Sequence, residues 1–299
     1  MCLYMPHCKT FDLAQGMAIY GSEAFVLYHF GACGVYDLAA KSPEPIGTFR
    51  LGSYNEGVPD GRYANHANSA MFSESFYQGN TIPLLYVTTG NDGGTDADGY
   101  IGRCAVENII KTTDKDGNTS YTAELIQTII YNDKGIESIE WETPCWGWPA
   151  SFVDSQNGWY YIFSARYRTS MAFKEYYDKN AFIITKFKLP KTTSSGETVT
   201  LTPADIIDQF TAPFDIFITQ GGTLYRGKIY YTFGFGTPEA PNGIRVFDLE
   251  NKKMADRIDL SNSIFANEEI EGCAVYNGTL LCNTADANIY QLDYEVNKN

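Results

Sequence analysis

The chain has 299 residues and a formal net charge of −14, from 22 Lys and Arg against 36 Asp and Glu. An acidic surface repels phosphate backbones, so the charge balance argues against a nucleic-acid partner. No stretch of the sequence approaches the roughly 20 apolar residues that a membrane-spanning helix requires. Aromatic residues make up 15% of the chain, with 22 Tyr and 18 Phe, and these residue types favour strands. The composition therefore indicates an all-β protein, and a chain of this length can form a single β domain.

The first ten residues, "MCLYMPHCKT", are too short and too polar to be a signal peptide. The chain is therefore either intracellular or the product left after a leader is removed. We favour the second alternative, which predicts an extracellular or periplasmic protein without a membrane span. The segment 8–13, "CKTFDL", precedes the first of several repeats.

One pattern recurs five times along the chain, and we read it as the start of a repeated structural unit. Each copy has a polar or aromatic residue, a small residue, a short apolar strand, a turn and a tyrosine-rich strand. The copies begin at Gln15, His66, Trp146, Gln220 and Glu271. The first and fourth copies continue with two further alternating strands, which gives four antiparallel strands per unit. Such a unit is the blade of a β-propeller.

The sequence therefore predicts a five-bladed β-propeller that spans 1–299 as one domain. Two of the units carry polar insertions, at 112–120 and 191–200, which we expect to be solvated loops. The last unit has room for only three strands before the chain ends. We expect residues 8–13 to supply its fourth strand, which would close the ring and remove exposed strand edges.

The first residues of the five innermost strands should surround one mouth of the central channel. The candidate mouth residues are Gln15, His66, Trp146, Gln220 and Glu271, with Asn68 and Trp148 two positions further along. A glycine or alanine follows each blade start, which allows the backbones to approach closely. Aromatic rings with a few convergent polar groups are typical of a small-molecule pocket.

Each of these residues also has a structural interpretation. Gln15 and Gln220 could bond to neighbouring strand ends, the two tryptophans could belong to the core, and His66 could be a hydrogen-bonded structural residue. In the ligand interpretation, the tryptophans would stack on a sugar or another planar group. Glu271 is the only carboxylate among the blade starts, and partial burial would raise its pKa and suit it to acid–base chemistry. The preceding Glu268 and Glu269 could be solvated charges.

Metal ligands are a weaker interpretation of two clusters, and we predict no cofactor. Asp92, Asp96 and Asp98 in "NDGGTDADG" could hold a structural calcium ion, but their spacing fits no standard loop. Cys2, His7 and Cys8 lack a second Cys/His pair at a spacing suited to zinc.

The Asn277-Gly278 dipeptide predicts a two-residue hairpin turn. Counting outward from that turn places Cys273 opposite Cys282. A disulfide could form there, but we expect two free thiols.

Two family resemblances bear on function. The stretches "FITQGGTLYRGKIYYTFGFG" and "EIEGCAVYNGTLL" resemble the plant and bacterial glutaminyl cyclases, which are five-bladed propellers. That resemblance implies that Gln220 contacts the substrate and that Glu271 shuttles a proton when an N-terminal glutamine cyclises. The family has this pair in its first two blades, whereas here it falls in the last two. The whole chain, including "NHANSA", also resembles uncharacterised secreted propellers of gut bacteria, which implies an envelope or extracellular setting.

Three functions follow in order of preference. The first is a binding module that holds a small carbohydrate or peptide-derived ligand at the channel mouth. The second is an enzyme of glutaminyl-cyclase type that uses Glu271 as its acid and base. The third is a protein-interaction scaffold, for which no specific residues argue. The sequence leaves the oligomeric state open.

Overall fold

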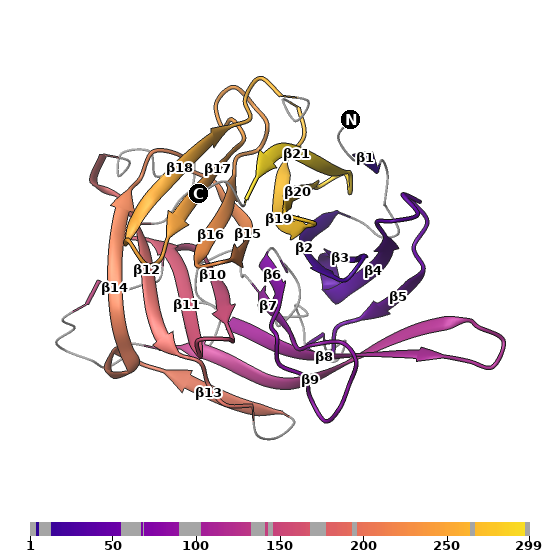
Figure 1. Ribbon diagram of the computed structural model, residues 1–299. Coiled ribbons are helices and arrows are strands. Elements are labelled where there is room, and N and C mark those ends of the chain that lie inside the picture. The colour runs from indigo at the N-terminus through magenta and orange to yellow at the C-terminus, as the bar shows by residue number, and fades with distance from the viewer. Residues whose placement is uncertain are drawn as a thin grey trace.

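The computed structural model describes residues 4–5, 13–54, 67, 69–89, 103–132, 141–142, 146–167, 178–192, 196–263 and 267–296. These residues form five sheets arranged around a common centre (Figure 1). Strands β2, β6, β10, β15 and β19 lie innermost, and the other strands of each sheet follow outward. The predicted five-bladed β-propeller is therefore confirmed.

The blades follow one another along the chain. Blade 1 consists of β2 (Ala14–Tyr20), β3 (Glu23–Tyr28), β4 (Ala32–Asp37) and β5 (Gly47–Arg50). Blade 2 contains β6 (Ser69–Phe72), β7 (Leu85–Thr89), β8 (Arg103–Thr113) and β9 (Thr119–Tyr131), with β13 (Glu197–Leu201) added at its edge. Blade 3 consists of β10 (Trp146–Asp154), β11 (Trp159–Ala165), β12 (Ala181–Lys188) and β14 (Ile206–Pro213).

Blade 4 consists of β15 (Thr219–Tyr225), β16 (Lys228–Phe233), β17 (Gly243–Asp248) and β18 (Lys253–Asp259). Blade 5 consists of β19 (Ile270–Tyr276), β20 (Thr279–Thr284), β21 (Ile289–Glu295) and β1 (Tyr4–Met5). The helical elements of the described residues are two short 3₁₀ turns, His29–Gly31 and Pro203–Asp205.

Blade 5 contains strands from both ends of the chain, as predicted. Strand β1 pairs antiparallel with β21, with Tyr4 opposite Tyr290 and Met5 opposite Ile289. The pairing residues lie upstream of the predicted segment 8–13, of which residues 8–12 fall outside the described part of the chain. The closing strand covers the edge of β21, so the last blade has the same four-stranded form as the first.

The predicted hairpin of blade 5 is confirmed in its register. Asn277 and Gly278 both have positive φ, 49° and 76°, which is the conformation of the type I′ turn that joins twisted strands. Cys273 lies opposite Cys282, and both cysteines are free and buried, as we expected.

The first polar insertion is mostly exposed, as predicted, and residues 114–118 form a turn. Its ends extend β8 and β9 into a long hairpin that projects from the propeller, which the sequence did not predict (Figure 1). In that extension Tyr121 packs its ring against Phe25 and Phe49 of blade 1. The second insertion contributes β13, which pairs parallel with β9. Its alternating "ETVTL" pattern suits an edge strand with one face buried, and the two insertions thereby link neighbouring blades.

Candidate functional site

Four innermost strands contain a β-bulge where the sequence places the blade start. The register of the strand pairs shifts between Ala14 and Met17, Trp146 and Ala150, Thr219 and Gly222, and Ile270 and Gly272. A bulge bends its strand and redirects a side chain. The bulges therefore redirect the backbone at the positions of Gln15, Gln220 and Glu271, at the end of each blade where the inner strand begins.

Small residues allow the inner strands to approach one another. The Gly16 amide donates to the Ala67 carbonyl at 2.8 Å, and Ser69 Oγ donates to the Gly222 carbonyl at 3.2 Å. A Cβ on Gly272 would lie 3.5 Å from the Gly16 Cα. Direct contacts of this kind between blades agree with the expectation that glycine or alanine is needed beside the channel.

Glu271 is a buried carboxyl with an exposed fraction of 4%. Burial, together with the negative charge of Glu269, raises the pKa of Glu271 well above its ordinary value. Among the described residues, no hydrogen bond reaches this carboxyl group. Burial therefore favours the neutral form of Glu271, in which the carboxyl group can both donate a hydrogen bond and accept one.

Glu269 connects Glu271 to the neighbouring blade. Its Oε1 accepts a hydrogen bond of 2.8 Å from Gln220 Nε2, and the same amide donates to the Gly234 carbonyl at 3.1 Å. Burial raises the pKa of Glu269, and the bond from Gln220 opposes that rise. Gln220 thus positions a carboxyl group at the mouth, in addition to bonding to its own blade.

The interpretation of Glu268 and Glu269 as solvated charges is wrong for both residues. Each is half-buried. The Glu268 carboxylate accepts hydrogen bonds from Thr284 and Asn288, both at 2.8 Å, and from the hydroxyl of Tyr290. Spacing along the strand does not predict Glu269, because β19 begins at Ile270 and its register shifts between Ile270 and Gly272.

Gln15 and Asn283 bring further amide groups to the mouth. Gln15 has an exposed fraction of 3%, and its Nε2 donates to the Ala14 carbonyl at 3.0 Å. Asn283 is fully buried, and its Nδ2 donates to the Gln15 carbonyl at 2.6 Å. Gln15 Oε1 and Asn283 Oδ1 have no hydrogen-bond partner among the described residues.

Sequence reasoning missed Asn283, although counting outward from the Asn277-Gly278 turn places it opposite Gly272. A Cβ on Gly272 would lie 3.0 Å from Asn283 Oδ1. The amide therefore sits directly against the residue that follows Glu271.

The remaining predicted site residues are only partly described. His66 and Asn68 lie outside the described residues, and Trp146 and Trp148 are described only by their backbone in β10. The Asp92, Asp96 and Asp98 cluster and the Cys2, His7 and Cys8 group also lie outside. Within the described ranges, no three His, Cys, Asp or Glu side chains are grouped so as to hold a metal ion. No helix in those ranges has the length and apolar character to cross a bilayer.

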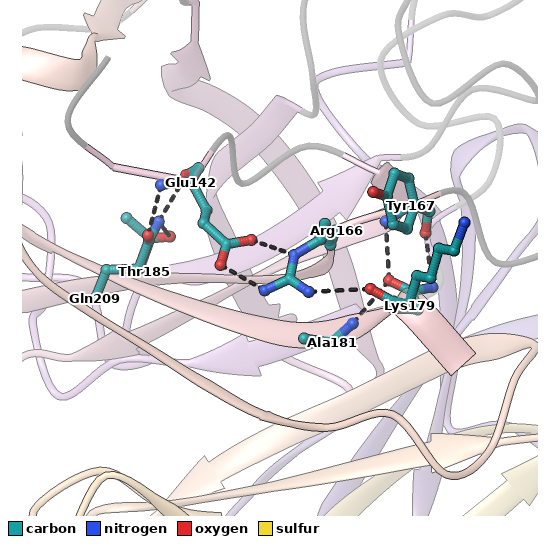
Figure 2. Close-up of polar contacts among 8 residues, drawn as sticks. Glu142, Arg166, Tyr167, Lys179, Ala181, Thr185 and Gln209 are labelled. Atoms are coloured by element: carbon teal, nitrogen blue, oxygen red, sulfur yellow. Dashed lines mark hydrogen bonds and ion pairs between the residues drawn. The ribbon is translucent and has the colours of Figure 1, made fainter. Parts of the chain in front are cut away.

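The chain enters β10 beside a charged clamp in blade 3 (Figure 2). Arg166 holds the Glu142 carboxylate with two hydrogen bonds of 2.6 Å. The backbone of Glu142 exchanges hydrogen bonds with the Gln209 side chain, at 2.9 Å and 2.8 Å. The hydrogen bond from Arg166 lowers the pKa of the Glu142 carboxyl. The clamp thus holds Glu142 between Arg166, which follows β11, and Gln209 of β14.

Comparison with known proteins agrees with the fold. No family model matches the sequence, and no curated protein sequence matches it. Among solved structures, the chain resembles the crystal structure of Myxococcus xanthus glutaminyl cyclase, with a TM-score of 0.51 and 13% sequence identity. The alignment covers 98% of this chain and 94% of that one. The molecule is thus a five-bladed β-propeller whose fold resembles that of glutaminyl cyclase.

Proposed function

We propose that the protein binds a small peptide-derived ligand at the mouth of the propeller where the inner strands begin. The observation that carries this proposal is the gathering of buried acceptor groups there. Gln15 Oε1 and Asn283 Oδ1 have no partner among the described residues, and Glu271 directly precedes Gly272, against which Asn283 Oδ1 lies. A buried acceptor without a partner costs about 1–3 kcal/mol, so a ligand rich in N–H groups would relieve that cost.

The carboxyl pair favours an amino-terminal ligand over a neutral sugar at this mouth. The negative charge of Glu269 disfavours ionisation of Glu271. A ligand ammonium group would stabilise the Glu269 charge, while the amides of Gln15, Gln220 and Asn283 would pair with peptide or carboxamide groups. His66, Asn68, Trp146 and Trp148 remain predictions from the sequence for the same mouth.

Calorimetric titration with the dipeptide Gln-Ala and with its N-acetylated form tests this proposal. We expect the free amine to bind, and acetylation or Glu269→Gln to weaken binding at least about tenfold by removing a charge-assisted hydrogen bond. Glu44→Gln, an exposed carboxyl on blade 1, is the control that removes equal charge. Equal binding of both peptides, or equal loss in both variants, would contradict the proposal.

A second candidate is catalysis of the glutaminyl-cyclase type, and the specific observation in its favour is the raised pKa of buried Glu271. In this reaction the α-amino nitrogen of an N-terminal glutamine bonds to the side-chain amide carbon, and the amide nitrogen leaves as ammonia. In its ionised form, a carboxyl with a raised pKa is a stronger base than an ordinary carboxylate, so it can take the proton from the attacking amine and then pass it to the leaving nitrogen. The fold likeness is consistent with this candidate, and Gln220 precedes Glu271 by one blade, as the resemblance implies.

The two candidates differ in what Glu271→Gln does. Turnover of an N-terminal glutamine peptide, followed by mass spectrometry as loss of ammonia, should disappear in the variant while dipeptide affinity persists. A wild-type protein that binds Gln-Ala without releasing ammonia would leave only the binding function. We also propose an extracellular or periplasmic location, on the sequence resemblance alone. The scaffold alternative gains no support from particular residues.

A further inference from the structure

A cavity lies on the same face of the propeller as the mouth, beside blade 4. It has a volume of about 490 Å³, which is within the range of small-molecule pockets. Residues of the loop between β16 and β17 line one side, and Ser261, Asn262 and Asn267 line the other. The lining residues are Gly236, Thr237, Pro238, Pro241, Asn242, Ser261, Asn262 and Asn267.

The lining is neutral throughout, although the chain as a whole has a net charge of −14. It has three asparagine amides and two hydroxyls, groups that each donate and accept hydrogen bonds. Sugar hydroxyls also donate and accept hydrogen bonds. Among the lining residues that the structure describes, none has a large apolar side chain that would receive a peptide side chain, and none is charged. This chemistry matches a neutral saccharide.

The walls of the cavity are fixed by packing and hydrogen bonds. Asn242 is buried, and its Nδ2 donates to the Glu268 carbonyl at 2.7 Å. Gly236 has a φ of 72°, and a Cβ there would lie 2.4 Å from the same carbonyl oxygen. Pro238 and Pro241 restrict the loop further. Ordering such a pocket on binding costs little conformational entropy, which favours affinity for a small ligand.

An aromatic residue is next to the cavity lining along the chain. Phe235 directly precedes the lining residue Gly236, and 38% of its surface is exposed. An exposed ring offers apolar surface for the C–H face of a pyranose. We propose that this cavity, with Phe235 at its edge, is a binding site for a neutral saccharide, separate from the carboxyl-lined mouth.

Saturation-transfer NMR with the methyl glycosides of glucose, galactose, mannose and N-acetylglucosamine tests this site. We expect at least one of them to bind, and the double variant Asn262→Ala/Asn267→Ala to weaken that binding about tenfold by removing two hydrogen-bonding groups. Both side chains are exposed, so the variant should fold, which circular dichroism checks. Asn157→Ala, in an exposed turn at the opposite end of blade 3, is the matched control and should bind as wild type.

Glu269→Gln separates this site from the proposed mouth function, because it should weaken dipeptide binding at the mouth and leave saccharide binding unchanged. Three results would overturn the inference. The first is no saturation transfer from any of the four glycosides. The second is equal binding by the double variant and the wild type. The third is displacement of the bound glycoside by the uncharged peptide acetyl-Ala-Ala-amide, which would identify the cavity as a peptide site.

Discussion

Replacing Glu271 with glutamine should change how the stability of the protein depends on pH. The raised pKa of buried Glu271 means that the folded state holds a proton that the unfolded chain releases above its ordinary pKa, near 4.5. Below that pH both states are protonated, and Glu271 adds no pH dependence. Above it, the unfolded state binds fewer protons, so stability falls as pH rises until the folded-state pKa is reached.

The size of the effect follows from one proton. Within that pH window, the free energy of unfolding of the wild type loses about 1.4 kcal/mol per pH unit through Glu271. Glutamine keeps the size and shape of the side chain but does not titrate. The free energy of unfolding of the variant, minus that of the wild type, should therefore rise by about 1.4 kcal/mol per pH unit. Glu107 and Glu269, whose pKa values are also raised by burial, are present in both proteins.

Urea unfolding at half-unit steps from about pH 4 to about pH 8, at constant ionic strength, measures this difference. Glu44→Gln serves as the control for removing one negative charge from an exposed position. If the stability profiles of Glu271→Gln and the wild type run parallel above the unfolded-state pKa, Glu271 is not held neutral by its surroundings. The reasoning about the mouth would then fail.

Three further predictions concern the scaffold. The Glu142–Arg166 pair is about one-third exposed, so a double-mutant cycle with glutamine at each position should give a coupling of roughly 0.5–1 kcal/mol. Because Arg166 lowers the pKa of Glu142, that coupling should be present above the pKa that Glu142 has in the unfolded chain. It should vanish as the pH falls through the pKa that Glu142 has in the folded protein. A coupling that persists in acid would contradict this prediction. Gly222→Ala would bring a methyl group 2.4 Å from a carbonyl oxygen of β16. It should lower the free energy of unfolding by urea by about 1–3 kcal/mol. A variant as stable as the wild type would show that the inner strands can accommodate a side chain at this position. Tyr121→Ala should lower the free energy of unfolding by about 3–5 kcal/mol. Tyr121→Phe should lower it far less, because the ring packs on blade 1 while the hydroxyl makes one hydrogen bond to Glu23. Equal losses in the two variants would mean that the hydroxyl, not the ring, holds the hairpin.

The propeller could be predicted from the sequence because its blades are local structures. Each blade start repeats the same order of small, apolar and aromatic residues, and a two-residue turn such as Asn277-Gly278 fixes the register of the strands around it. The pairing of Cys273 with Cys282 followed from counting alone. The contribution of the N-terminus to blade 5 followed from the missing strand, although the residues that pair are Tyr4–Met5.

The parts that sequence reasoning missed depend on contacts between blades. Strand β13 belongs by sequence to the region of blade 3, yet it pairs with the edge of blade 2, and nothing in its local pattern selects that partner. Glu269 reads as one of two adjacent surface acids until Gln220 of the neighbouring blade is placed 2.8 Å from it. Asn283 becomes a mouth residue only because its amide bonds to the Gln15 backbone of blade 1.

A crystal structure of the protein with bound Gln-Ala tests the central claim most directly. The account predicts that the dipeptide lies at the mouth, with its ammonium group within hydrogen-bond distance of Glu269 or Glu271. Its amide N–H groups should donate hydrogen bonds to Gln15 Oε1 or Asn283 Oδ1, two buried acceptors without partners among the described residues. A dipeptide bound away from these four side chains, with both carboxyl groups unchanged in their surroundings, would contradict the account.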